Sequence, residues 1–246
     1  MFCLNLKMKL NELDFLLTSQ GFERTNYPLS FPLVIHGVPG CGKSTLIRTL
    51  LVDINTAART CGTPYGATLQ HPGVLAPRDH PIAPSIDRRI LDEYQLADTR
   101  TIADFNVLFG DPYQGSFRLS PHYTKSLSHR VPKPVCEFLR TRGFDIAGER
   151  SGRITTANPY SPELNSTDWL KHTILHLGPA SAALTHSHAI CSRSSAEVQG
   201  LEFENTTVVY HSSEKTQTVP FYVCCTRASQ SLTLTSDEFH EFHTSA

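Results

Sequence analysis

Several features that mark whole classes of protein are missing from this 246-residue sequence. No apolar run approaches the ~20 residues that a membrane-spanning helix requires, so we expect no direct membrane insertion. The apolar residues at the N-terminus are interrupted by Lys7, Lys9 and Glu12, and no small-residue cleavage site follows them. We therefore do not expect a signal peptide.

Cysteine pairs at metal-binding or redox spacing are also missing. The seven cysteines are odd in number, none forms a CxxC pair, and two of them are adjacent. This usage predicts reduced thiols in a cytosolic protein rather than a disulfide framework. Some histidines occur in close pairs, but no Cys or acidic residue stands beside them at ligand spacing, so we interpret them as polar side chains and not as zinc ligands.

The sequence has no overall excess of positive charge, since its formal net charge is −1. Affinity for nucleic acid comes largely from neutralising phosphates, so an RNA-binding protein of this charge needs a local basic surface. Residues 118–153 carry eight Lys or Arg against three Asp or Glu. This segment is either such a surface or an ordinary solvated face, and composition alone leaves both interpretations open.

What the sequence does contain is the composition and element pattern of a soluble α/β protein. Hydrophobic residues make up 39% of it, which is typical of globular chains. After a leucine-bearing helix that ends near Gly21, the pattern predicts a buried strand at 31–36, a glycine-rich loop at 37–44 and a helix at 45–52. Strand, glycine loop and helix in this order open a fold with a parallel sheet.

Further apolar runs predict a sheet in each half of the chain. Strands are expected at 89–92, 104–109, 173–177, 206–210 and 232–235. Residues 221–225 either open a helix or belong to the apolar core, and the Pro- and Gly-rich residues 61–87 are expected to form loops around one short strand. A cluster of Ser, Pro and His near residue 120 predicts two domains, 1–120 and 121–246.

The glycine loop fits the pattern GxxxxGK[ST] at every fixed position. Glycines let the backbone curl so that its N–H groups point at phosphate oxygens, while the lysine reaches the β- and γ-phosphates and the hydroxyl coordinates magnesium. A glycine turn without a ligand is the alternative, but it does not account for the strand and helix on either side. The expected nucleotide-binding residues are Gly37, Gly40, Gly42, Lys43, Ser44 and Thr45.

An acidic pair follows the second expected strand. Asp92 and Glu93 come directly after Ile90 and Leu91. A magnesium-dependent triphosphatase needs one carboxylate to hold the metal and another to orient and deprotonate the attacking water. We therefore predict that Asp92 joins Ser44 as a metal ligand and that Glu93, with Lys43, is catalytic.

Three further polar residues have the chemistry of phosphoryl transfer. Gln114 follows the third expected strand within Gly-Asp-Pro-Tyr-Gln, where an amide can sense the γ-phosphate. Arg130 and Arg227 offer planar, permanently charged guanidinium groups that suit the charge developing on a transferring phosphoryl group. A Gly-Pro turn and two surface charges are the ordinary alternatives, and the order of these segments along the chain favours the functional interpretation.

Six segments together resemble helicase motifs I to VI of superfamily 1, in the order of that family. They are GVPGCGKST, LDEYQ, FGDPYQG, SHR, VQGLEF and CCTRA, which span residues 37–228. The short length and the opening of the chain, with a leucine-bearing helix followed by GFERT at 21–25, resemble the first triple-gene-block movement proteins of potexvirus-like and allexivirus-like plant viruses.

This resemblance implies a fold and a biology that spacing does not show. It implies two RecA-like P-loop domains with parallel sheets, a superfamily 1 core without accessory subdomains, and ATP and Mg²⁺ as cofactors. It also implies RNA binding, RNA-stimulated ATP hydrolysis, limited unwinding, transport of viral RNA through plasmodesmata and suppression of RNA silencing in the host cytoplasm. The implied partners are single-stranded viral RNA, other viral movement and coat proteins, and further copies of the chain.

The resemblance also assigns the fifth motif and marks three departures. Gln199, Gly200 and Glu202 match it, and Glu202 is expected to reach the nucleotide sugar. Thr63–Gly66 is a weak match for motif Ia, Ser194 and Ser195 stand where a threonine is usual, and there is no room for inserted subdomains. Two other functions remain open, a non-motor RNA- or host-factor-binding protein that uses ATP as a switch and a small-molecule P-loop kinase.

Overall fold

The computed structural model describes residues 2–62, 82–115, 117–160, 171–239 and 243–245. The chain divides into two compact units. Unit 1 comprises Met1–Pro112 and Phe117–Ser126, and unit 2 comprises Tyr113–Ser116 and Leu127–Ala246. The chain therefore passes into unit 2 for four residues, returns to unit 1, and leaves it again after Ser126.

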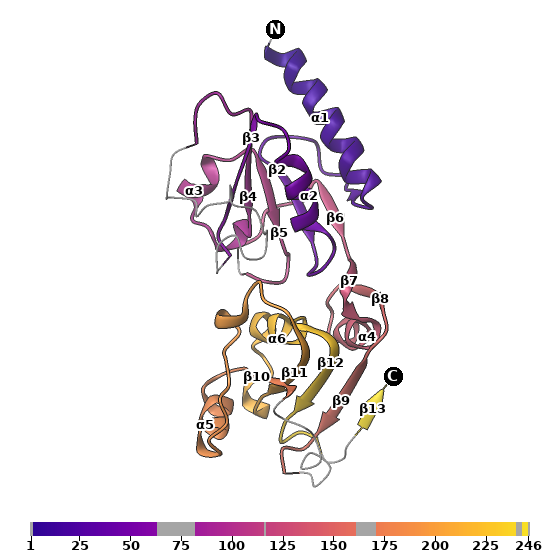
Figure 1. Cartoon of the computed structure of the whole chain (residues 1–246), viewed down its shortest axis with the longest axis vertical. Coiled ribbons are helices and arrows are strands. Elements are labelled where there is room, and N and C mark those ends of the chain that lie inside the picture. Colours follow the sequence, from indigo (N-terminus) through magenta and orange to yellow (C-terminus); the bar gives the residue numbers. More distant parts are fainter. Residues whose placement is uncertain (1, 63–81, 116, 161–170, 240–242, 246) are drawn as a thin grey trace. The chain divides into compact units, whose positions relative to one another are not determined.

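Unit 1 is built on a six-stranded sheet in the order β1-β6-β2-β5-β4-β3 (Figure 1). Neighbouring strands from β6 to β3 are parallel, and only the edge strand β1 is antiparallel. The elements of this unit are α1 (Phe2–Ser19), β1 (Glu23–Arg24), β2 (Leu33–Gly37), α2 (Lys43–Leu50), β3 (Thr56–Thr60), β4 (Arg88–Asp92), η1 (Tyr94–Leu96), α3 (Thr99–Ala103), β5 (Val107–Gly110) and β6 (Tyr123–Lys125).

The central strands of unit 1 are apolar because they are buried within a parallel sheet. Every residue of β2 and of β5 is buried, as expected for strands covered on both faces. Helix α2 packs through Leu46, Ile47 and Leu50. Since parallel strands end at the same edge, the segments after β2, β5 and β4 emerge next to one another, and these are the segments with the glycine loop and the acidic residues.

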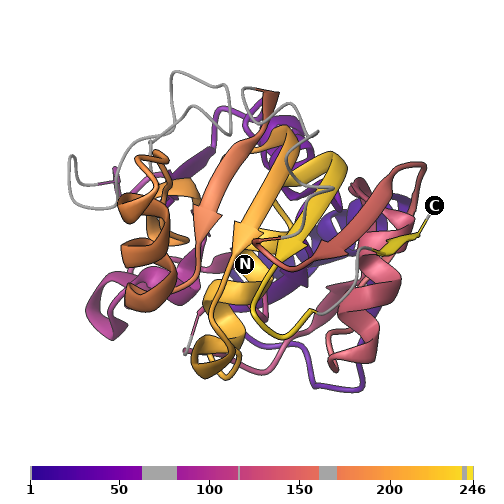
Figure 2. The same cartoon turned by 90° about the horizontal axis from the view of Figure 1, so that it is seen from below.

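Unit 2 contains a five-stranded sheet in the order β10-β11-β12-β9-β13, and a separate parallel pair formed by β7 and β8 (Figure 2). The strands from β10 to β9 are parallel, and β13 is antiparallel to β9. Its elements are β7 (Leu127–Pro132), α4 (Lys133–Thr141), β8 (Ala147–Arg150), β9 (Arg153–Ala157), β10 (Thr173–His176), α5 (Pro179–Ser187), η4 (Ala196–Val198), β11 (Phe203–Val209), η5 (Ser212–Glu214), α6 (Thr218–Cys225), β12 (Ala228–Thr235) and β13 (His243–Ser245).

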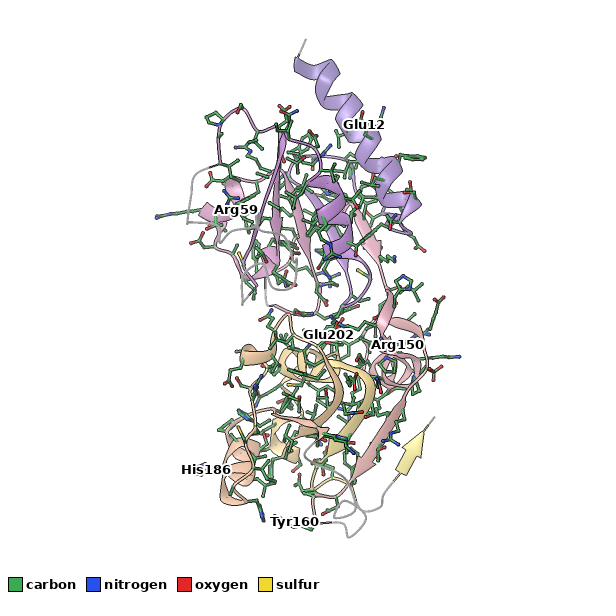
Figure 3. The ribbon with its side chains drawn as sticks, viewed as in Figure 1. Glu12, Arg59, Arg150, Tyr160, His186 and Glu202 are labelled. Carbon is green, nitrogen blue, oxygen red and sulfur yellow. The ribbon has the colours of Figure 1, made fainter. Side chains whose placement is uncertain are left out.

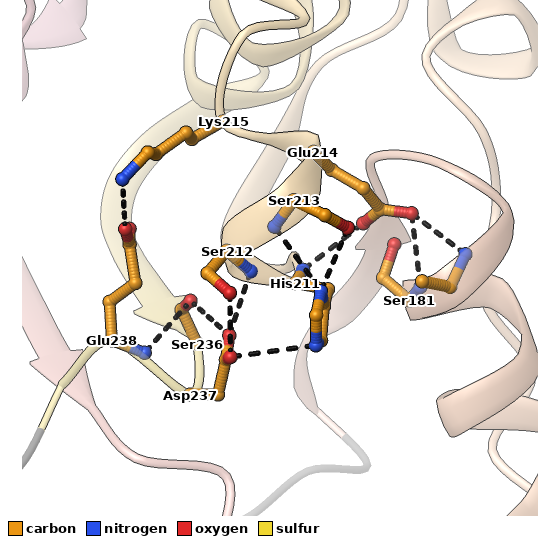
Figure 4. Close-up of polar contacts among 10 residues, drawn as sticks. Ser181, His211, Ser212, Ser213, Glu214, Lys215, Ser236, Asp237 and Glu238 are labelled. Atoms are coloured by element: carbon orange, nitrogen blue, oxygen red, sulfur yellow. Dashed lines mark hydrogen bonds and ion pairs between the residues drawn. The ribbon is translucent and has the colours of Figure 1, made fainter.

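Polar side chains tie together the loops that follow β10, β11 and β12 (Figure 4). Glu214 is buried, and its Oε1 accepts hydrogen bonds from the backbone N–H groups of Ala180 and Ser181 at 2.8 and 3.2 Å. The carboxylate of Asp237 accepts from the backbone N–H and the hydroxyl of Ser212. The first turn of α5 is therefore capped by a carboxylate from the loop after β11.

The expected α/β class with parallel sheets is confirmed. The strands expected at 31–36, 89–92, 173–177, 206–210 and 232–235 correspond to β2, β4, β10, β11 and β12. Residues 221–225 are buried in the core, as one interpretation expected, and they are helical, but they end α6 rather than open it. Sequence reasoning did not predict β7, α4, β8 or β9, and it began β5 three residues too early, since Asp104 and Phe105 lie in the turn after α3.

No helix among the described residues is both long and apolar enough to cross a membrane. The N-terminal helix instead packs one face against unit 1, where Leu13 and Leu17 are buried and the Tyr123 hydroxyl donates to Asp14 at 2.5 Å. The weak motif Ia match at Thr63–Gly66 lies outside the described residues.

Candidate nucleotide site and arginine cluster

The glycine loop leaves the start of α2 open. Gly42 is the N-cap residue, has a φ of 103°, and supplies no side-chain cap to the helix. A Cβ atom added at Gly42 would meet nothing within 4 Å. The first N–H groups of a helix need acceptors, and the positive end of the helix dipole favours an anion there. The loop therefore has the local geometry of a phosphate cradle.

Lys43 lies in this cradle and is almost fully buried. Its Nζ donates to the carbonyl oxygens of Gly37 and Val38, at 2.5 and 3.3 Å. Burial by itself lowers the pKa of Lys43, but attraction from Cys41, Asp111 and the acidic pair outweighs it and raises the pKa above its usual value. The lysine is charged at any working pH.

The acidic pair stands at the end of β4, and its first member fits a magnesium ligand. Asp92 is buried, and its Oδ1 accepts no hydrogen bond from the described residues. Burial and the neighbouring charge of Glu93 raise the pKa of Asp92, while Lys43 opposes the rise. A buried carboxylate oxygen that accepts no hydrogen bond suits a hard divalent cation. The second expected ligand of this cation is the half-buried hydroxyl of Ser44 at the start of α2.

Glu93 is held in a defined orientation by a residue that sequence reasoning missed. Its backbone has a φ of 54°, in the left-handed region that non-glycine residues rarely adopt. The side-chain amide of Gln95 donates to Glu93 Oε2. Gln95 is itself buried and packs close to Gly110, where an added Cβ would lie 2.5 Å from Gln95 Oε1. The signal for Gln95 was its place two residues after the acidic pair.

His36, the residue before Gly37, connects the glycine loop to the acidic segment. Its Nε2 lies 2.7 Å from the Tyr94 hydroxyl, and the two rings stack with their centroids 5.9 Å apart. Burial, followed by the positive charges of Arg118 and Lys43, lowers the pKa of His36 to about 4. His36 is therefore neutral near pH 7, and the pair fixes the strand before the loop to the segment that carries Glu93.

The Gly-Asp-Pro-Tyr-Gln segment is divided between the two units. Asp111 is buried in unit 1, where its charge acts on Lys43. Gln114 is buried too, but it belongs to unit 2. The structure therefore gathers Lys43, Asp92, Glu93 and Asp111 within unit 1, and assigns Gln114 to the unit that contains the expected arginines.

In unit 2 the three later motifs converge. Arg130 Nη1 lies 3.3 Å from Glu202 Oε2, and Arg130 Nη2 donates to the carbonyl oxygen of Thr226 at 3.4 Å. Glu202, labelled in Figure 3, immediately precedes β11 and is exposed. Arg227 follows Thr226, so both predicted arginine fingers lie in one cluster with the expected sugar-binding glutamate.

The guanidinium of Arg227 is almost completely buried and makes several hydrogen bonds. Its Nε, Nη1 and Nη2 donate to Val223 O, Leu201 O and Thr226 Oγ1, at 3.0, 3.0 and 3.1 Å. In this arrangement Arg227 joins the end of α6 to the segment before β11. Its assignment as a finger remains a prediction, and the structure adds a packing role.

The remaining residues of the fifth motif lie between η4 and β11. Gln199 is the C-cap residue of η4, and Gly200 has a φ of 81°. Gln199 is half-buried, and its Nε2 has no hydrogen-bond partner among the described residues. At the position where threonine is usual, the backbone N–H and hydroxyl of Ser194 both donate to Glu197, each at 2.7 Å.

The basic residues between 118 and 153 are divided between the two units. Arg118 and Lys125 belong to unit 1, and the other six belong to unit 2. Arg142 lies over the rings of Phe138 and Phe221, 4.9 and 4.7 Å from their centroids, and Arg130 is engaged in the cluster described above. Both interpretations of this segment, a basic surface for RNA and an ordinary solvated face, stay predictions.

Residues 33–236 match the family described as the viral superfamily 1 RNA helicase core domain. The fold is similar to that of the arterivirus nonstructural protein 10 helicase, with a TM-score of 0.59 at 17% identity over 85% of this chain and 60% of that one. The chain thus spans about 60% of the length of that helicase, and the likeness concerns the fold alone.

Relatives of similar length narrow the family further. The chain is 34% identical to the protein named "Movement and silencing protein TGBp1" of Potato virus X, over 86% of this chain and 92% of the relative. It is 32% identical to the protein of the same name from Lily virus X, over 86% and 93%. The chain belongs to the family of TGBp1 movement and silencing proteins.

Proposed function

We propose that this chain is an RNA-dependent ATPase that acts as a viral cell-to-cell movement protein and as a suppressor of RNA silencing. The names of its relatives support the biological part. The observation that carries the chemical part is the start of α2, where the N-cap residue Gly42 supplies no side-chain cap, beside a buried lysine and a buried carboxylate oxygen that has no donor among the described residues. An anion and a divalent cation satisfy these groups together.

Different residues of unit 1 would bind the phosphates, hold the metal ion and activate the attacking water. Gly37, Gly40, Gly42 and Thr45 would hold the triphosphate of ATP with Lys43, while Ser44 and Asp92 would hold Mg²⁺, which neutralises charge on the phosphate oxygens. Glu93, oriented by Gln95, accepts the proton of the attacking water as the bond to the γ-phosphorus forms and the bond to the bridging oxygen breaks.

The residues of unit 2 would respond to nucleotide and RNA. Gln114 senses the γ-phosphate, Arg130 and Arg227 stabilise the charge that develops during transfer, and Gln199, Gly200 and Glu202 contact the nucleotide. This division is the reason for proposing two RecA-like domains and a helicase core without accessory subdomains. The proposed partners are single-stranded viral RNA, other viral movement and coat proteins and further copies of the chain, in the host cytoplasm and at plasmodesmata.

Steady-state ATP hydrolysis by the full chain, with and without single-stranded RNA, tests the proposal. Stimulation by RNA, dependent on Mg²⁺ and absent after chelation with EDTA, is the expected result. Hydrolysis that ignores RNA would favour the second candidate, a non-motor binding protein that uses ATP as a switch. That candidate has specific support in the engaged guanidinium of Arg227, which has several protein acceptors in this structure.

A further inference from the structure

Tyr113 connects the Gly-Asp-Pro-Tyr-Gln segment to the aromatic core of unit 2. The Tyr113 ring lies 5.3 Å from the ring of Phe144 in an edge-to-face arrangement and 5.2 Å from that of Tyr222. Phe144 and Tyr222 are themselves in contact, with centroids 4.8 Å apart. The Tyr113 hydroxyl accepts a hydrogen bond from the backbone N–H of Asp145 at 2.9 Å. The rings of Phe144 and Tyr222 and the hydrogen bond from Asp145 therefore hold Tyr113.

Tyr222 links this ring cluster to the predicted finger. It lies on α6, one turn before Arg227, and its carbonyl oxygen accepts from the N–H of Thr226 at 3.0 Å. Arg227 in turn donates to Val223, the next residue of the same helix turn. The Tyr113 ring therefore packs against the helix turn that sets the position of Arg227.

Tyr113 lies in sequence between two residues of the proposed nucleotide site. Asp111, two residues earlier, belongs to unit 1 and acts electrostatically on Lys43. Gln114, the next residue, belongs to unit 2. Pro112 between them has a fixed φ and little freedom to absorb a displacement. The Tyr113 ring therefore provides a contact, directly beside Gln114, between this segment and the helix that precedes Arg227.

We propose that Tyr113 is a positioning residue that holds Gln114 in register with Arg227 within unit 2, and that this register is needed for RNA to stimulate ATP hydrolysis. This inference rests on the proposed function, because it concerns the coupling of hydrolysis to RNA. Tyr113 contacts neither substrate, and its effect is transmitted through Gln114 and α6.

The test is the ratio of kcat with saturating RNA to kcat without RNA, measured for three variants of the full chain. In Tyr113→Ala we expect the ratio to fall towards one, while KM for ATP and the Kd for a single-stranded RNA oligonucleotide each change less than about twofold. Tyr113→Phe keeps the rings and loses the hydrogen bond to Asp145, so it should retain most of the ratio.

Phe138→Ala is the matched control. Phe138 is also half-buried in unit 2, and its ring packs on Phe221 with the centroids 6.2 Å apart. A general loss of packing would lower both kcat values in proportion in either alanine variant and leave the ratio intact. If Tyr113→Ala fails to fold by urea denaturation, Tyr113→Leu replaces it, since Leu keeps apolar volume without the ring.

The outcomes separate this inference from the proposed function. A ratio lost in Tyr113→Ala and kept in Tyr113→Phe and Phe138→Ala supports the positioning role. Full RNA stimulation in Tyr113→Ala overturns that role and leaves the proposed function intact. No RNA stimulation in the wild-type chain overturns the proposed coupling and this inference with it.

Discussion

Each unit contains a strand, a glycine-bearing turn and a helix, but the first N–H groups of the two helices differ in whether a side chain of the protein caps them. In unit 1 the loop between β2 and α2 runs from Val38 to Gly42, and Gly42, the N-cap residue of α2, supplies no side-chain cap. In unit 2 only Leu177 and Gly178 separate β10 from α5, and Glu214 places its carboxylate on the N–H groups of Ala180 and Ser181. One helix end is open to an external anion, and the chain itself supplies the anion for the other.

The glycines make the same contrast. A Cβ atom at Gly42 would meet nothing within 4 Å, whereas one at Gly178 would lie 2.6 Å from Glu214 Oε1. Gly42 is needed for its positive φ, and Gly178 is needed so that a buried carboxylate can approach the backbone. A helix start is therefore a candidate phosphate site only where no carboxylate of the chain already occupies it.

The largest expected effect is on ATP hydrolysis and concerns Lys43, at the start of α2, where Gly42 supplies no side-chain cap. Lys43→Ala should lower ATP hydrolysis by at least about 1,000-fold, or ~4 kcal/mol, because the charge on the β- and γ-phosphates is lost. RNA binding should be largely retained. Steady-state hydrolysis and RNA filter binding measure the two properties. Lys215→Ala, which removes the lysine paired with Glu238 in unit 2 at 2.9 Å, is the control and should hydrolyse ATP normally.

Next in size is the effect of the two arginines of unit 2 that are predicted to be fingers. Arg227→Ala should lower kcat about 100-fold and raise KM for ATP less than about threefold, because a finger acts mainly in the transition state. Arg130→Ala provides a parallel measurement on its half-buried neighbour. A kcat equal to that of the wild type, in a variant whose urea midpoint has fallen, would leave Arg227 with only its packing role.

A smaller effect is expected from Gln95, which orients Glu93. Gln95→Leu keeps the volume of a buried side chain but removes the donor to Glu93, so kcat should fall about tenfold with little change in KM. Gln217→Leu serves as the control, because Gln217 is also a glutamine, is half-buried, and lies next to Gly178 in unit 2. Equal kcat values for the two variants would contradict the role given to Gln95.

The smallest expected effect is on the stability of the protein, and it concerns Glu214, which caps the start of α5. Glu214→Gln would turn an amide N–H₂ towards the N–H of His211, which donates to Glu214 Oε2 at 3.1 Å. We expect a loss of about 1–2 kcal/mol in the free energy of unfolding at pH 7, measured by urea denaturation. ATP hydrolysis should be unchanged, and nucleotide should still bind once per chain. A second nucleotide bound in this variant would break the comparison between the two helix ends.

The pH dependence of that loss has a definite sign. Burial by itself raises the pKa of Glu214, but hydrogen bonds from His211, Ser181 and Ala180 bring it below the usual 4.5. A carboxylate with a lowered folded-state pKa stabilises the protein above its unfolded pKa, and this contribution disappears as the pH falls through the folded pKa. The difference in stability between wild type and Glu214→Gln should therefore shrink in acid.

Much of unit 1 could be predicted because its signals are short and local. The glycine loop, the apolar strands β2 and β4 and the acidic pair each occupy fewer than ten consecutive residues. β7 and β8 could not be predicted in the same way, because they pair in parallel across an intervening helix and their mixed polar and apolar composition has no clear period. Helix α4 did carry a local signal that was missed, since its buried residues Val135, Cys136 and Leu139 recur at helical spacing.

The sequence by itself was enough to predict a phosphate site at the start of α2, because the conformation of a glycine loop and the start of a helix depend on neighbouring residues. It also determined the family through the order of its motifs. The tertiary structure alone decided that Glu214, 34 residues from Ala180, closes the other helix end. It also decided that Gln114 belongs to the unit of Arg227. Both outcomes depend on contacts between residues far apart in the chain, which no local pattern records.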